Sequence, residues 1–85
     1  MQITYTSDAK SHLDFWIKSG NKIIIKRILQ ITQSIIETPF DGIGKPEALK
    51  YELTGFWSRR INSEHRFVYK IEENSLFIFS LKGHY

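Results

Sequence analysis

The chain has 85 residues, of which 41% are hydrophobic and 25% are charged, and its formal net charge is +3. A chain of this length has material for only one marginally stable core, which excludes a second domain, and its hydrophobic content excludes a disordered protein. It contains no cysteine, which excludes disulfides and thiolate metal ligands. No apolar run approaches the ~18 residues of a membrane span, and the first residues have no signal-peptide pattern. We therefore expect one domain, residues 1–85, in the cytoplasm, with an anionic partner favoured by the basic charge.

The first part of the chain predicts a short strand followed by two helices. Ile3 and Tyr5 alternate with polar residues, as in a half-buried strand. Ser7 or Asp8 can cap a first helix. A break at residues 19–21 precedes a longer helix, whose isoleucine-rich stripe continues up to a Thr-Pro pair. Two helices joined by so short a break form an αα-hairpin.

The second part of the chain predicts a loop and four short strands. Glycine and proline indicate a loop over residues 40–48. The strands are expected at residues 49–53, 56–61, 66–71 and 76–82, with turn signals between them. The whole pattern predicts an α+β fold, in which an N-terminal strand and the αα-hairpin pack on one face of a mainly antiparallel sheet of four or five strands.

This topology has a geometric consequence for three polar residues. Adjacent strands of a meander run in opposite directions. Among the last four strands, the starts of the first and third therefore lie at the same end of the sheet as the ends of the second and fourth. We therefore expect Glu47, Arg66 and His84 to lie within side-chain reach of one another, although they are far apart in the sequence.

A carboxylate, a guanidinium and an imidazole are the groups needed to cleave RNA without a metal. The 2′-hydroxyl of RNA is its own nucleophile, so cleavage needs a base, a cation for the phosphate and an acid for the leaving oxygen. Glu47 can act as the base and Arg66 can bind the phosphate oxygens. His84 is the natural acid, because an imidazole pKa near ~6.5 suits proton transfer at neutral pH. Tyr85 can stack on a base or orient its neighbours.

Further cations are candidates for holding the RNA, and we expect phosphate contacts from Lys45, Lys50, Arg59 and Arg60. Arg59 and Arg60 should point to opposite faces of their strand, so at most one of them joins a given site. Trp57, in the same strand, is expected in the core.

The three histidines, at positions 12, 65 and 84, have no metal-ligand spacing, so neither a metal nor another cofactor is expected. His65 is expected to be a turn or packing residue.

These residues resemble the YoeB/Txe family of toxins from bacterial toxin–antitoxin pairs, within the wider RelE/ParE superfamily. The resemblance covers essentially the whole chain. It is carried by Pro-Phe-Asp-Gly-Ile-Gly-Lys-Pro-Glu at 39–47, Gly-Phe-Trp-Ser-Arg-Arg-Ile-Asn at 55–62, Glu-His-Arg at 64–66, and the closing pair His84-Tyr85.

The resemblance implies a RelE-like fold and a ribosome-dependent endoribonuclease, an mRNA interferase that cleaves mRNA in the ribosomal A site and so inhibits translation. It assigns Glu47 as general base, Arg66 as phosphate stabiliser, His84 as general acid and Tyr85 as an orienting residue. It further implies that Lys50 and Arg59 contact RNA. The partners it implies are the 70S ribosome with its mRNA, a cognate YefM-like antitoxin and a second copy in a homodimer, with no membrane involved.

One departure from the family pattern is visible, and two alternatives stay open. The lead-in to His84 is Ser-Leu-Lys-Gly, where a more basic or aromatic segment is expected, and Gly83 is expected to loosen the position of His84. The first alternative is a non-catalytic RNA- or ribosome-binding module, in which His84 has no role. The second is a ParE-like toxin that acts on a different target through the same scaffold.

Overall fold

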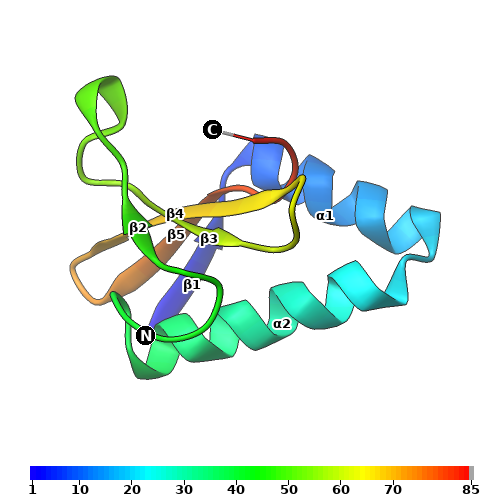
Figure 1. Ribbon diagram of the computed structural model, residues 1–85, viewed down its shortest axis with the longest axis horizontal. Helices are drawn as coiled ribbons and strands as arrows, with labels where there is room; N and C mark the ends of the chain where they lie inside the picture. Colours follow the sequence, from blue (N-terminus) through cyan, green and yellow to red (C-terminus); the bar gives the residue numbers. More distant parts are fainter. Residues whose placement is uncertain (85) are drawn as a thin grey trace.

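The chain forms two helices and a five-stranded mixed sheet, shown in Figure 1 as a computed structural model that describes residues 1–84. The elements in chain order are β1 (Gln2–Tyr5), α1 (Ser7–Ser19), α2 (Lys22–Glu37), β2 (Glu47–Ala48), the 3₁₀ turn η1 (Tyr51–Leu53), β3 (Trp57–Arg60), β4 (Arg66–Glu72) and β5 (Ser75–Ser80). The strand order is β1-β5-β4-β3-β2, with β1 parallel to β5 and all other pairs antiparallel. The predicted α+β architecture is confirmed.

Local capping defines the helix ends. The Thr6 hydroxyl caps α1 by accepting a hydrogen bond from the Ala9 amide at 3.2 Å, one residue earlier than the sequence predicts. Gly20 ends α1 in the left-handed conformation, with φ at 69°. The Asn21 side chain then caps α2 by accepting from the Ile24 amide at 3.1 Å. No helix within residues 1–84 is long and apolar enough to cross a membrane.

The hydrophobic core lies between the helices and one face of the sheet. Isoleucines at one-turn intervals along α2 form its helical side, and the alternate residues of β4 and β5 form its sheet side. The core consists of Ala9, Trp16, Ile24, Ile28, Ile31, Ile35, Ile61, Phe67, Tyr69, Leu76, Ile78 and Leu81. Both helices lie on this side, and no helix within residues 1–84 covers the opposite face of the sheet (Figure 1). We call that opposite side the open face.

The prediction of a strand at residues 49–53 is wrong. The alternation of apolar residues there indicated a strand, but the chain turns back at Lys50, whose carbonyl accepts from the Leu53 amide at 3.2 Å. Tyr51 has a φ of 59° and is 90% exposed at the tip of this hairpin. The strand that pairs with β3 lies earlier, at Glu47–Ala48, inside the predicted loop.

Candidate active site

The sheet register brings Glu47 and Arg66 onto the open face. Glu47 pairs with Ser58, and Ser58 pairs with Val68, so these three residues form one row across β2, β3 and β4. Arg66 precedes Val68 by two positions and therefore lies on the same face. With a rise of about 3.3 Å per residue and about 4.8 Å between strands, the Cα atoms of Glu47 and Arg66 are about 12 Å apart. Two long side chains can meet across that distance around one phosphate.

The Arg66 side chain is largely enclosed by the turn between β3 and β4 and is only 9% exposed. Its Nη1 donates to the carbonyl oxygens of Asn62 at 2.8 Å, His65 at 3.3 Å and Ser63 at 3.4 Å. Within residues 1–84, these bonds engage Nη1 and neither of the other two guanidinium nitrogens. The turn therefore holds one nitrogen of the guanidinium and restricts the orientation of the group.

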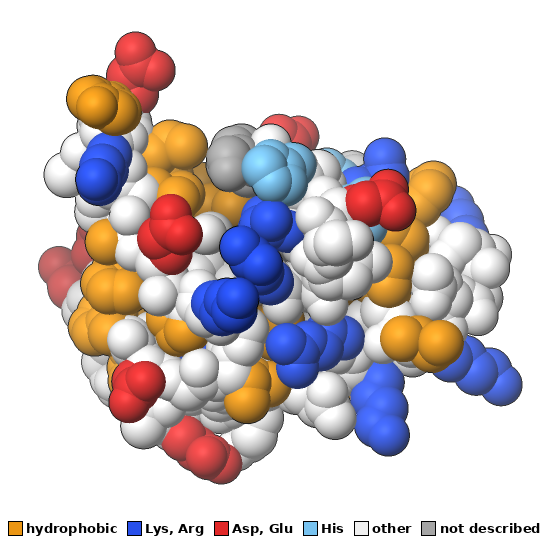
Figure 2. Space-filling model, viewed as in Figure 1, with side chains coloured by type: hydrophobic (Ala, Val, Ile, Leu, Met, Phe, Trp, Pro, Cys, Tyr) orange, Lys and Arg blue, Asp and Glu red, His pale blue; other side chains and the backbone are white. Residues whose placement is uncertain are grey.

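His84 follows a segment that is bonded directly to the start of β4. The carbonyl of Gly83 accepts a hydrogen bond from the Arg66 amide at 2.9 Å, and the Gly83 amide donates to Nδ1 of His65 at 3.0 Å. His84 itself is exposed, one residue beyond these bonds. Figure 2 shows Lys and Arg side chains grouped beside an exposed His near the end of the chain. Tyr85 lies outside the described residues.

Arg59 does not occupy the surface place that the sequence analysis gave it. Its side chain is on the core face, is 0% exposed, and donates five hydrogen bonds to protein atoms. Nε donates to Tyr69 Oη at 3.2 Å, Nη1 to Ser34 Oγ at 2.7 Å and Ile43 O at 3.2 Å, and Nη2 to Thr38 O and Asp41 O at 2.8 Å each. With every donor engaged in the interior, Arg59 anchors the loop that leads into β2 and has no group left to contact RNA.

Arg60 is the arginine of this strand that lies on the open face, in agreement with the expectation that at most one of the two arginines joins a given site. It is exposed and pairs directly with Arg66 across the β3–β4 ladder. Like charges directly opposite each other are unfavourable. The only ion pair within residues 1–84 joins Lys70 to Glu72, so neither arginine has a carboxylate partner in that part of the chain. Two facing cations without such a partner are suited to an anionic ligand.

Lys45 and Lys50 are both exposed, one on each side of β2. Lys45 follows Gly44, whose carbonyl accepts from the Arg60 amide at 2.7 Å, so this loop is fixed to the end of β3. Lys50 precedes the turn η1. Both lysines therefore flank Glu47 and add positive charge at its edge of the sheet.

His12, Trp16 and His65 also contact the segment before His84, and the sequence analysis gave none of them a role in the site. The Leu81 amide donates to Nδ1 of His12 at 3.1 Å, and the Leu81 carbonyl accepts from Trp16 Nε1 at 2.9 Å. The predicted packing role of His65 is confirmed, since its ring meets that of Trp16 edge-on with centroids 4.8 Å apart. No sequence motif links these residues to positions 81–83.

The pKa of His12 lies below the ordinary histidine value. Burial is the largest cause, because it disfavours the charged imidazole. The negative charge of Asp8 acts in the opposite direction, and the positive charge of Lys82 lowers the pKa further. A neutral His12 is the form whose Nδ1 can accept the Leu81 amide.

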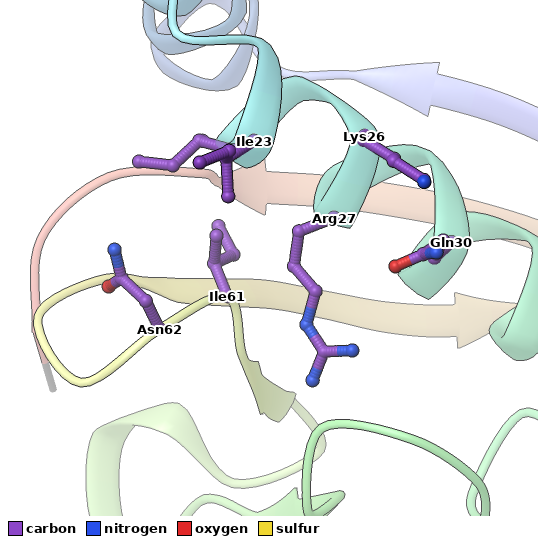
Figure 3. Close-up of a pocket in the computed structure, with 7 residues that line it drawn as sticks. Ile23, Lys26, Arg27, Gln30, Ile61 and Asn62 are labelled. Atoms are coloured by element: carbon purple, nitrogen blue, oxygen red, sulfur yellow. The ribbon is translucent and has the colours of Figure 1, made fainter.

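A cavity of about 380 Å³ lies between α2 and the β3–β4 turn (Figure 3). It is lined by Ile23, Ile24, Lys26, Arg27, Gln30, Ile61 and Asn62. Arg27 crosses towards β3 and its Nη2 donates to the Arg60 carbonyl at 3.5 Å. The lining holds no carboxylate or imidazole, so the cavity is separate from the acid–base groups, although Asn62 also contacts Arg66.

Comparisons with known proteins agree on one family. Residues 5–85 match the model of the YoeB-like toxin of bacterial type II toxin–antitoxin systems. The chain is 48% identical over 85 residues to a Toxin YoeB from Synechocystis sp., covering 100% of this chain and 98% of the relative.

Solved structures give the same result. A YoeB/ParE toxin from Agrobacterium tumefaciens superposes with a TM-score of 0.96 at 34% identity, with 100% of both chains covered. A YoeB from Staphylococcus aureus, solved as a dimer and in a YoeB–YefM complex, gives TM-scores of 0.91 and 0.90 at 41% and 42% identity, covering 100% of this chain and 98% of the other in each case. The chain therefore belongs to the YoeB-like toxins of bacterial type II toxin–antitoxin systems.

Proposed function

We propose that this toxin is a ribosome-dependent endoribonuclease that cleaves mRNA in the ribosomal A site and thereby stops translation. The observation that carries the proposal is the convergence of three groups from distant parts of the chain. The register places Glu47 and Arg66 on one face, and the backbone bond between Arg66 and Gly83 brings His84 to the same end of the sheet.

The proposed reaction uses only groups of the chain and the RNA. Glu47 removes the proton of the 2′-hydroxyl, and the resulting oxygen attacks the adjacent phosphorus. The bond from phosphorus to the 5′-oxygen breaks, and His84 gives that oxygen its proton. The products are a 2′,3′-cyclic phosphate and a free 5′-hydroxyl. Arg66 stabilises the charge that develops on the phosphate, and the bonds of its Nη1 to the turn orient the guanidinium for this role. Tyr85 is proposed as an orienting residue.

Arg60, Lys45 and Lys50 are proposed to position the RNA. All three are exposed and border Glu47 or Arg66. Contacts of this kind bind phosphates irrespective of base sequence, so they set register and affinity. In this proposal Arg60 contacts the RNA, whereas the buried Arg59 does not.

The partners are proposed from relatives of known assembly. The Staphylococcus aureus YoeB has been solved as a dimer and in complex with YefM. By analogy, we propose that the present toxin forms a homodimer and is neutralised by a YefM-like antitoxin.

The decisive experiment maps the 5′ ends of translated mRNA after brief expression of the wild type, Glu47→Gln and His84→Ala. Each variant should lower the cleavage rate by roughly 10²–10⁴-fold, because each removes one proton-transfer group. Glu37→Gln is the matched control, since it neutralises an exposed carboxylate at the end of α2 and should cleave like the wild type.

Co-sedimentation with ribosomes distinguishes the non-catalytic alternative. The proposal requires that Glu47→Gln and His84→Ala still bind ribosomes while cleavage and growth arrest disappear. If growth arrest persists in both variants and no new 5′ ends appear with the wild type, the chain acts by binding alone and the nuclease proposal fails.

A further inference from the structure

The segment before His84 is fixed to the domain by side chains from two other elements. Leu81 is fully buried, and both of its backbone polar groups are bonded: the amide to His12 Nδ1 and the carbonyl to Trp16 Nε1. Both partners lie on α1, one helical turn apart. This arrangement attaches residue 81 to a rigid element.

The next attachment comes from the β3–β4 turn. His65 Nδ1 accepts the Gly83 amide at 3.0 Å, and the adjacent Arg66 amide donates to the Gly83 carbonyl at 2.9 Å. The His65 ring rests edge-on against Trp16, so the two attachments support each other. We call His12, Trp16 and His65 the tail clamp.

Gly83 fits this geometry for a conformational reason. Its φ is 97°, a region that residues with a Cβ rarely adopt. Both backbone polar groups of Gly83 are bonded, and the expectation that Gly83 loosens the position of His84 stays a prediction. The glycine lets the chain turn so that these two bonds form together.

We propose that His65, supported by Trp16, is a positioning residue for the general acid. By holding Gly83, it sets the point from which the His84 imidazole reaches the leaving 5′-oxygen beside Arg66. The inference rests on the proposed function for its catalytic meaning. His65 acts through an acceptor atom, because Nδ1 binds an amide hydrogen and must carry no proton. An asparagine can present an acceptor oxygen in its place, whereas a leucine cannot.

The test compares His65→Leu, His65→Asn and the control Ser11→Ala, an exposed residue next to His12 on α1. Hydrogen exchange of the Gly83 amide, followed by NMR, reads the bond itself. Cleavage by programmed ribosomes gives kcat and KM. We expect His65→Leu to exchange the Gly83 amide roughly tenfold faster. Its kcat should fall roughly 10- to 100-fold, the effect of displacing a catalytic group by about 1 Å, with KM within about twofold of the wild type.

Recovery of activity in His65→Asn distinguishes a positioning role of His65 from a general effect of His65 on stability. His65→Asn should recover most of the exchange protection and most of kcat, and Ser11→Ala should match the wild type. If His65→Leu does not fold, Trp16→Phe, which removes only the indole donor to Leu81 and some ring volume, takes its place and should also lower kcat without raising KM.

The other outcomes decide separately on the tail clamp, the positioning role of His65 and the nuclease proposal. Unchanged Gly83 exchange in His65→Leu overturns the tail clamp. Faster exchange with an unchanged kcat overturns the positioning role but leaves the nuclease proposal intact. If the wild type itself does not cleave, the proposed function fails and the catalytic role of His65 fails with it, while the exchange data still decide whether His65 holds the tail.

Discussion

Two consecutive arginines of β3 have opposite environments. Arg59 is buried with five hydrogen bonds to protein atoms, and Arg60 is exposed opposite Arg66. The alternation of side chains along a strand accounts for this difference. Trp57 was expected in the core, and it is half-buried and packs against the core. Arg59 lies two residues after Trp57, so the same alternation could have placed Arg59 inside and Arg60 on the open face.

Substitutions of Arg59 and Arg60 should differ in their effect on stability. Arg59→Ala should lower the free energy of unfolding by about 3 kcal/mol or more, because it removes the five hydrogen bonds that the guanidinium donates to Tyr69, Ser34 and three loop carbonyls, and it opens a cavity. Arg60→Ala should change it by no more than about 0.5 kcal/mol, as an exposed substitution. Urea denaturation measures both values. Equal losses in the two variants would contradict the anchoring role of Arg59.

His12 gives a second prediction, on pH. Burial holds its pKa below the ordinary value in the folded protein, against the opposing charge of Asp8 and with a further contribution from Lys82. The unfolded chain therefore takes up a proton at a higher pH than the folded chain does. The contribution of neutral His12 to the free energy of unfolding is therefore complete above about pH 6.5, and it decreases as the pH falls towards the pKa of His12 in the folded protein.

The measurement is the urea midpoint at about pH 7.5 and about pH 5.5. The wild-type midpoint should fall over this interval, and it should fall less in His12→Asn, which keeps an acceptor for Leu81 but does not titrate there. The same decrease in both proteins would assign the pH dependence to other groups.

Among the helices and strands, the sequence predicts those whose buried side chains recur at the period of a helix or of a strand. The isoleucines of α2 have a helical period and are buried at that period, so the helix is predictable almost to its ends. Residues 49–53 have the period of a strand without its burial, because Tyr51 is exposed at a turn. The short strand Glu47–Ala48 has no apolar alternation, and only its pairing with β3 defines it.

The candidate site is predictable only in part, because strand direction can be read from the sequence but side-chain contacts to backbone atoms cannot. Strand direction alone predicts that Glu47, Arg66 and His84 approach one another. The register has Glu47 and Arg66 on one face, and the Gly83 carbonyl next to His84 accepts from the Arg66 amide. The contacts that fix the tail are different, since they join α1 and the β3–β4 turn to backbone atoms of residues 81–83. Any residue except proline offers the same backbone groups, so the sequence identifies none of the partners of these groups, although the positive φ of Gly83 favours glycine at that position.

For the whole molecule, the charge distribution predicts how ribosome binding depends on salt. The net charge is +3, and Arg60 and Arg66 face each other on the open face. If they contact phosphates, binding releases counterions and weakens as salt increases. Arg60→Ala should lower the slope of log K against log salt by about one, with little change in stability. A titration of ribosome binding at several salt concentrations measures the slope. Binding that does not vary with salt would contradict a phosphate-binding face.

The position of β5 has a consequence for biosynthesis. This strand lies between β1 and β4, so the first strand of the chain has no neighbour in the sheet until residues 75–80 are in place. A nascent chain that has emerged only as far as β4 therefore lacks the strand that joins β1 to the rest of the sheet, and it lacks the core residues Leu76 and Ile78. Folding during translation must wait for this late segment, which delays the toxin's maturation until nearly all of these residues have left the ribosome that makes it.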